Sequence, residues 1–173
     1  RNEHLQGPQP LYTVTCVLQD AAGEELDRQV RRVGFKHVDW QPCEGAPEEA
    51  DPWICVVNGR PVFMQGVNFA PLSGLYAALT YADYATRLGQ YRELGANILR
   101  INACQFLERT WFYDLCDELG LMVWQEYPLT SSGIDNWPPE DEQSIAAVAE
   151  IARSFVQRRR MSKPIDSFLD LRA

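Results

Sequence analysis

The chain has few residues of the kind that bind metal ions. It contains only two histidines, His4 and His37, and its five cysteines include no C-x-x-C pair. Structural zinc sites need four such ligands at close, regular spacings. We therefore expect no metal site and, since no cofactor-binding motif is found either, no cofactor.

Long apolar runs are also missing. The longest, 54–57 and 121–124, fall far short of the ~20 residues that span a bilayer. Residues 1–10 contain no apolar core of a signal peptide, so a targeting segment is expected to be absent or to lie upstream. The sequence does not fix the compartment. The odd cysteine set favours a reducing one such as the cytoplasm, with Cys55, Cys104 and Cys116 as buried thiols.

Positive charge is in short supply. Sixteen basic against 24 acidic side chains give a net charge of −8. Such a surface repels the phosphates of nucleic acids and the anionic face of a membrane, so neither is an expected partner. With 173 residues, 46% of them hydrophobic, the chain has enough material for a globular core.

The first forty residues are typical of antiparallel strands. Residues 11–18 alternate and are rich in β-branched side chains, 20–23 form a turn, and 26–40 continue as a second and a third strand bent near Gly34. We interpret them as the end of a β-sandwich. The stretch 41–52 contains three prolines and little apolar surface, which indicates a linker or an exposed loop.

Strands and helices then alternate. Asn58-Gly59 predicts a hairpin whose second strand, about 62–67, begins the new pattern, with further strands near 97 and 121. Three helices are predicted from caps and apolar spacing. The first begins at the capping box Thr80/Asp83 and ends at Gly95, the second ends at Gly120, and the third opens at Pro138 and Pro139. Their predicted apolar stripes are Tyr84, Leu88, Tyr91 and Leu94 in the first helix, and Leu107, Trp111, Leu115 and Leu119 in the second.

Such alternation predicts parallel strands with right-handed crossovers, in either a doubly wound sheet or a (β/α)8 barrel. The sequence contains neither G-x-G-x-x-G nor G-x-x-x-x-G-K-[ST], the motifs expected of dinucleotide and nucleotide folds. The pattern therefore favours the barrel.

Three segments carry a resemblance to a known family. "VVNGRPVFMQGVNFAP", "LGANILRINACQFLERTWFYDLCDELGLMVWQEYP" and "SSGIDNWPP" together resemble glycoside hydrolase family 2, especially its β-mannosidase-like members. The resemblance covers roughly residues 10–160. It implies an immunoglobulin-like sandwich and linker in 1–50, a partial (β/α)8 TIM barrel of three βα units in 51–160, and a divergent tail in 161–173.

In barrels of this kind the site lies at the carboxyl ends of the strands. The residues expected there, as contacts for a carbohydrate substrate, are Asn68, Arg100, Asn102, Trp124 and Glu126. Structural alternatives stay open: an Arg100–Glu126 ion pair, a core position for Trp124, and backbone capping by Asn68 and Asn102.

The resemblance implies no catalytic residue in this chain. A retaining glycosidase needs two carboxyl groups about 5 Å apart. In the family, the acid/base is the Glu of an Asn-Glu pair after strand four, and the nucleophile is a Glu after strand seven. The chain's one Asn-Glu pair, Asn2-Glu3, precedes the predicted sandwich strands. We expect an inactive fragment of a β-glycosidase or, alternatively, a non-catalytic carbohydrate-binding α/β module. The sugar, the linkage and the oligomeric state are not predicted.

Overall fold

The computed structural model describes residues 9–102, 107–127 and 141–162. In these residues the strands form three separate sheets. The elements before the first helix are β1 (Tyr12–Gln19), β2 (Glu25–Val33), β3 (Val38–Gln41), β4 (Ile54–Val57), β5 (Arg60–Val62), β6 (Gly66–Phe69) and the 3-10 turn η2 (Tyr76–Ala78). Then follow α1 (Tyr81–Glu93), β7 (Ile98–Ile101), α2 (Thr110–Leu119), β8 (Met122–Gln125) and α3 (Glu142–Ser162).

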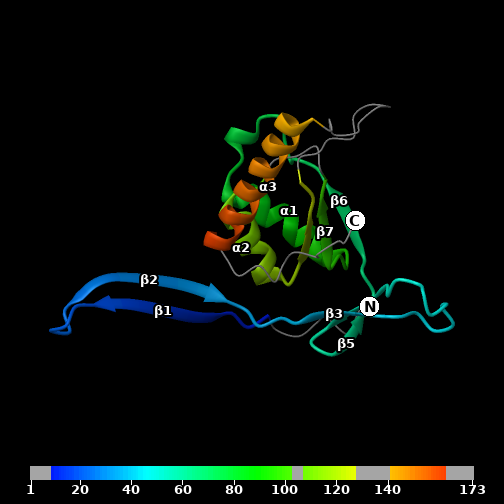
Figure 1. Ribbon diagram of the computed structural model, residues 1–173, viewed down its shortest axis with the longest axis horizontal. Coiled ribbons are helices and arrows are strands. Elements are labelled where there is room, and N and C mark those ends of the chain that lie inside the picture. Colours follow the sequence, from blue (N-terminus) through cyan, green and yellow to red (C-terminus); the bar gives the residue numbers. More distant parts are fainter. Residues whose placement is uncertain (1–8, 103–106, 128–140, 163–173) are drawn as a thin grey trace.

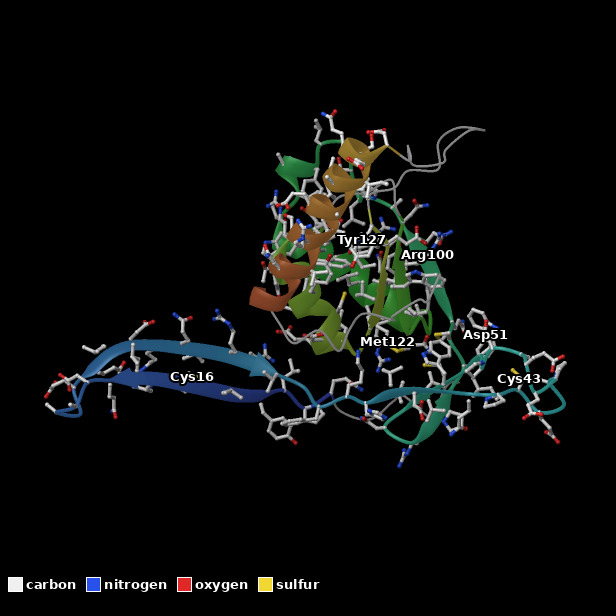
Figure 2. The ribbon with its side chains drawn as sticks, in the orientation of Figure 1. Cys16, Cys43, Asp51, Arg100, Met122 and Tyr127 are labelled. Atoms are coloured by element: carbon white, nitrogen blue, oxygen red, sulfur yellow. The ribbon has the colours of Figure 1, made fainter. Side chains whose placement is uncertain are left out.

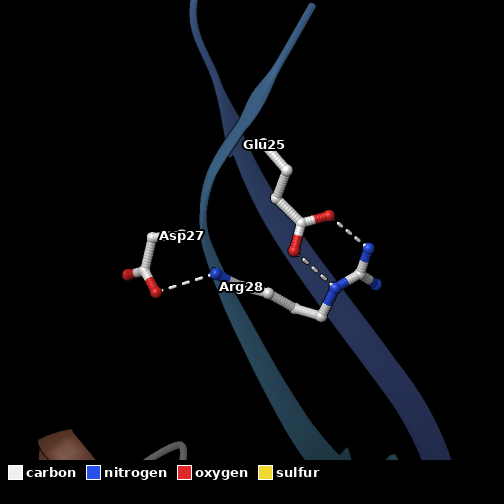
Figure 3. Close-up of polar contacts among 3 residues, drawn as sticks. All are labelled: Glu25, Asp27 and Arg28. Atoms are coloured by element: carbon white, nitrogen blue, oxygen red, sulfur yellow. Dashed lines mark hydrogen bonds and ion pairs between the residues drawn. The ribbon is translucent and has the colours of Figure 1, made fainter.

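β1 and β2 form a two-stranded antiparallel ribbon that runs away from the rest of the molecule (Figure 1). Every residue of the ribbon except Val33 is exposed, although β-branched side chains line it. On its surface Arg28 donates to both carboxylate oxygens of Glu25, and its backbone N–H donates to Asp27 (Figure 3). The predicted strands are confirmed, while the sandwich stays a prediction.

The predicted hairpin at Asn58-Gly59 is confirmed, but its assignment to the parallel strands is wrong. β4 pairs with β3 on one side and with β5 on the other in an antiparallel sheet, and Asn58 has a φ of 50°. The strand predicted over 62–67 is two strands: β5 ends at Val62, and β6 begins at Gly66 in another sheet. Asn97 fixes this connection, because its side-chain amide donates to the Phe63 carbonyl and accepts from the Gln65 N–H.

β6, β7 and β8 form a parallel sheet, in that order, with α1 and α2 as the intervening helices. The core lies between this sheet and the two helices. Its buried members are Phe69, Tyr84, Leu88, Leu99, Ile101, Phe112, Tyr113, Leu115, Cys116, Leu121 and Val123. This arrangement confirms the predicted alternation of strand and helix.

The helix boundaries follow the predicted caps. Thr80 and Asp83 form a capping box at the start of α1, and Gly95 and Gly120, both at positive φ, follow α1 and α2. The predicted stripes need correction: Leu94 is 76% exposed, and α2 buries Phe112, Leu115 and Cys116, while Leu107, Trp111 and Leu119 pack only partly against the core. Leu94 is exposed because it caps α1 and has left its buried face.

α3 begins later than predicted. Pro138 and Pro139 lie outside the described residues, and the helix starts at Glu142. Asp141 precedes it and accepts a hydrogen bond from the Ser144 N–H, which satisfies one of the free donors of the first turn. Among the thiols predicted to be buried, Cys55 and Cys116 are buried, whereas Cys104 lies outside the described residues.

Candidate functional site

Three of the predicted site residues form one row across the parallel sheet. In the register of the strands, Asn68 of β6 lies opposite Arg100 of β7, which lies opposite Trp124 of β8. Since neighbouring residues along a strand point to opposite faces, and Phe69, Ile101 and Val123 belong to the helix-side core, this row lies on the other face. Parallel pairing also brings the carboxyl ends of all three strands to one edge.

Arg100 is the centre of the row. Its Nη2 and Nε lie 2.5 and 2.6 Å from Oε1 of Glu126, and its Nη1 donates to Asn68 Oδ1 at 3.1 Å. Glu126 directly follows β8, and its N–H donates to the carbonyl of Ile101. The side chains of Arg100 and Glu126 are 35% and 21% exposed, so the pair is shielded from water but still reachable. Figure 2 shows Arg100 at the end of the strands opposite to Met122.

Trp124 packs against the same guanidinium. Arg100 Cζ lies 5.4 Å from the centre of the Trp124 ring, within the range of cation–π attraction. The Trp124 Nε1 is buried and has no hydrogen-bond partner in the described part of the chain. A buried N–H without an acceptor costs about 1–3 kcal/mol. A ligand that offers a hydrogen-bond acceptor to Nε1 would therefore remove this cost.

The contacts above link four of the five predicted residues. Asn68, Arg100, Trp124 and Glu126 are linked by the contacts above, whereas Asn102 follows β7 as a partly buried residue. The predicted structural alternative of an Arg100–Glu126 ion pair is present. A charged pair at a strand edge can also bind a ligand, because its hydrogen-bonding groups stay partly open to solvent.

A second polar cluster, around Glu108, was not predicted. The buried Glu108 carboxylate accepts from the hydroxyls of Tyr84 and Tyr76 at 2.8 and 3.1 Å on one oxygen. Burial raises the pKa of the Glu108 carboxyl, although the two phenol hydrogen bonds act to lower it. Burial likewise raises the pKa of Tyr84 and that of Tyr76.

Arg109 completes this cluster. Its guanidinium lies 5.2 Å from the Tyr76 ring and 5.6 Å from the Trp111 ring, and its Nη2 donates to the Tyr76 and Ala77 carbonyls at 3.4 Å. The cluster ties the connection after β6 to the connection after β7, at the same edge of the sheet as Arg100. No local sequence pattern predicts this cluster, because its hydrogen bonds join residues 24 to 33 positions apart.

The described residues offer no group of three or more His, Cys, Asp or Glu that could hold a metal ion. In the same part of the chain, every helix is too short or too polar to cross a bilayer.

Parallel strands joined by helices make this part of the chain an α/β fold, a class whose members commonly bind ligands at the carboxyl ends of their strands. No family model matches the sequence. The chain is 28% identical over 126 residues to the β-mannosidase of Bos taurus, covering 72% of this chain and 14% of the relative. It is 27% identical over 157 residues to the β-mannosidase of Capra hircus, covering 90% and 17%.

The chain is also similar to solved structures of glycosidases. The β-D-mannosidase of Dictyoglomus thermophilum matches with a TM-score of 0.73 and 33% identity, over 89% of this chain and 18% of that one. The exo-chitosanase of Amycolatopsis orientalis, 20% identical with a TM-score of 0.69 over 95% of this chain and 18% of its own, shares the fold. The chain belongs to glycoside hydrolase family 2. It spans 14–17% of the length of the curated relatives it matches.

Proposed function

We propose that the chain is part of a retaining glycoside hydrolase that acts on β-glycosides and is β-mannosidase-like. The support comes from the β-mannosidases of Bos taurus, Capra hircus and Dictyoglomus thermophilum, which match 72% or more of the chain. The proposed substrate is therefore a carbohydrate with a β-linked, mannose-type sugar.

In the same proposal, residues 51–160 supply the first three βα units of a (β/α)8 barrel. Residues 1–50 supply the end of an immunoglobulin-like sandwich and a linker, and 161–173 a divergent tail. The parallel order β6, β7, β8 supports the barrel assignment, because adjacent parallel strands with crossover helices are its repeating unit. The long ribbon of β1 and β2 supports the sandwich, because an isolated two-stranded ribbon is marginal in water.

The observation that carries the proposed site is the row Asn68–Arg100–Trp124, with Glu126 bound to Arg100. Sugars are bound by carboxylates and amides that contact hydroxyls and by aromatic faces that contact C–H groups. The row supplies one carboxylate, one amide, one guanidinium and one indole at a single edge, and we include Asn102 as a neighbour at the end of β7.

The chain by itself is proposed to be catalytically inactive. Retention needs an acid/base and a nucleophile about 5 Å apart on a single sugar. Glu126 provides one carboxylate, which is already ion-paired, and Glu108 is enclosed by tyrosines in a separate cluster. A sugar-contacting row without an acid pair also suits a second candidate, a non-catalytic carbohydrate-binding module.

Two measurements on the chain separate these possibilities. With nitrophenyl β-mannoside we expect no hydrolysis above buffer, and in calorimetry with mannose oligosaccharides no heat of binding, because the chain holds only part of the sugar site. Saturable heat without turnover supports the binding module. Saturable turnover contradicts the proposed inactivity.

The role of the row is tested in a longer barrel. Residues 66–127 would replace the corresponding segment of the β-D-mannosidase of Dictyoglomus thermophilum, which is 33% identical to this chain. In an active chimera, Glu126→Gln should lower kcat/KM by about tenfold or more, since hydrogen bonds to a charged group contribute about 1.5–3 kcal/mol. The matched control is Glu93→Gln, an exposed carboxylate at the end of α1. Equal effects of the two substitutions contradict a sugar-contacting role for Glu126.

A further inference from the structure

A chain of hydrogen bonds connects α2 to the end of β8. The hydroxyl of Tyr113 donates to Oε1 of Gln125 at 2.7 Å. The Nε2 of Gln125 donates in turn to the backbone carbonyl of Glu126 at 2.9 Å. Tyr113 is buried in the helix-side core, and Gln125, two residues after the buried Val123, lies on that same side of the sheet.

These bonds hold the backbone of Glu126 from two directions. Its carbonyl is bound by Gln125, and its N–H donates to the carbonyl of Ile101 in the neighbouring strand at 3.0 Å. With both backbone groups bound, the direction in which the Glu126 side chain leaves the chain is fixed. That direction leads to Arg100, whose Nη2 is 2.5 Å from the Glu126 carboxylate.

The burial of Tyr113 makes the arrangement rigid. A side chain only 4% exposed has little freedom to move, and its hydroxyl would be left without its Gln125 acceptor if β8 ended in another conformation. Gln125 uses the acceptor and a donor of its amide at once, which fixes its orientation. The carboxylate is thus held in place by residues on the opposite face of the sheet.

We propose that Tyr113 and Gln125 are positioning residues that orient Glu126 toward Arg100. They would also orient it toward a sugar hydroxyl, which rests on the proposed function. They act through the backbone of Glu126, as the second layer of contacts commonly does for groups that must be held within about 0.5 Å.

The test is a double-mutant cycle on the chain, measured by chemical denaturation. Tyr113→Phe and Glu126→Gln are made singly and together. If Tyr113 acts through Glu126, the combined loss in the folding equilibrium constant should differ from the product of the single losses by at least about twofold. Tyr91→Phe serves as the matched control, because Tyr91 packs against Phe69 from α1 and is far from β8 in sequence. Its cycle with Glu126→Gln should be multiplicative.

A second readout follows the hydrogen bond from the Glu126 N–H to the Ile101 carbonyl. Hydrogen exchange of the Glu126 N–H should speed up in Tyr113→Phe and remain unchanged in Tyr91→Phe. If Tyr113→Phe fails to fold, Gln125→Asn replaces it in the cycle, since it keeps the amide but shortens its reach. A multiplicative cycle with unchanged exchange overturns the positioning role. This outcome is independent of the chimera, so a failure of sugar contact and a failure of positioning are distinguished.

Discussion

Gly66 of β6 lies directly against Ile98 of β7. A Cβ placed on Gly66 would come within 2.1 Å of the Ile98 carbonyl oxygen and 2.6 Å of its Cγ2. The two residues face each other in the parallel register, two residues before the row of Asn68 and Arg100. Close approach at this point therefore helps to set the spacing of the strands that carry the candidate site.

Gly66→Ala should destabilise the chain by about 1–3 kcal/mol, because the obstacle is backbone and cannot move aside as a flexible side chain can. The matched control is Gly89→Ala in α1, where nothing lies within 4 Å of the added Cβ. That change should stabilise by about 0.5–1 kcal/mol, since alanine favours the helix. Urea denaturation measures both. Equal effects would contradict the close contact.

The Arg100–Glu126 pair should contribute more to stability than an exposed pair. Arg100→Leu leaves the partly buried Glu126 without its partner and should cost about 1–2 kcal/mol, between the values for exposed and buried pairs. Arg153→Leu, which removes an exposed pair with Glu150, should cost at most about 0.5 kcal/mol. Denaturation of both variants at one pH gives the comparison. A smaller effect at Arg100 than at Arg153 would rule out the site pair as a stabilising contact.

Glu108 should give the stability a defined dependence on pH. Because burial raises the pKa of Glu108, the folded chain holds this proton more tightly than the unfolded chain. The stability that the protonated Glu108 gives the folded chain is fully present below the ordinary pKa of glutamate. It is lost as the pH rises through the raised pKa. Glu108→Gln remains uncharged, so its stability relative to the original chain should increase over this window and then level off. Denaturation from pH 4 to pH 8 measures the difference, and a decrease with rising pH would refute the prediction.

The contribution of the capping box at the start of α1 to the stability of the chain should be measurable by itself. Thr80 accepts from the Asp83 N–H, and the Thr80 N–H donates to the Asp83 carboxylate. Thr80→Ala removes the first bond and should cost about 1 kcal/mol. Thr86→Ala, an exposed position inside the same helix, should be neutral or slightly stabilising, because alanine is the better helix former. If thermal denaturation shows equal losses for the two variants, the cap has no special role.

Much of the local structure could be predicted from the sequence. The turn at Asn58-Gly59, the cap at Thr80 and the helix ends at Gly95 and Gly120 all depend on conformations that a few neighbouring residues decide. The candidate site residues were predicted from the family resemblance, which implies a barrel with its site at the carboxyl ends of the strands. Their mutual geometry could not be predicted, since the register of separate strands is not a local property.

The failures have a common cause. β5 and β6 were predicted as one strand because their apolar residues are nearly continuous, and only the pairing of β5 with β4, in another sheet than β6, separates them. Leu94 keeps helical spacing, yet it caps the helix and is exposed. In both cases a periodic pattern continued past the point where the tertiary contacts end.

The sequence by itself determined where α1 and α2 end and that strands alternate with these two helices, because these features depend on backbone preferences and apolar spacing over a few positions. Tertiary structure decided that Asn68, Arg100 and Trp124 share one row and that Glu108 is enclosed by Tyr76 and Tyr84. Those contacts join residues 24 to 32 positions apart, and they form only when helices pack on a sheet of fixed register.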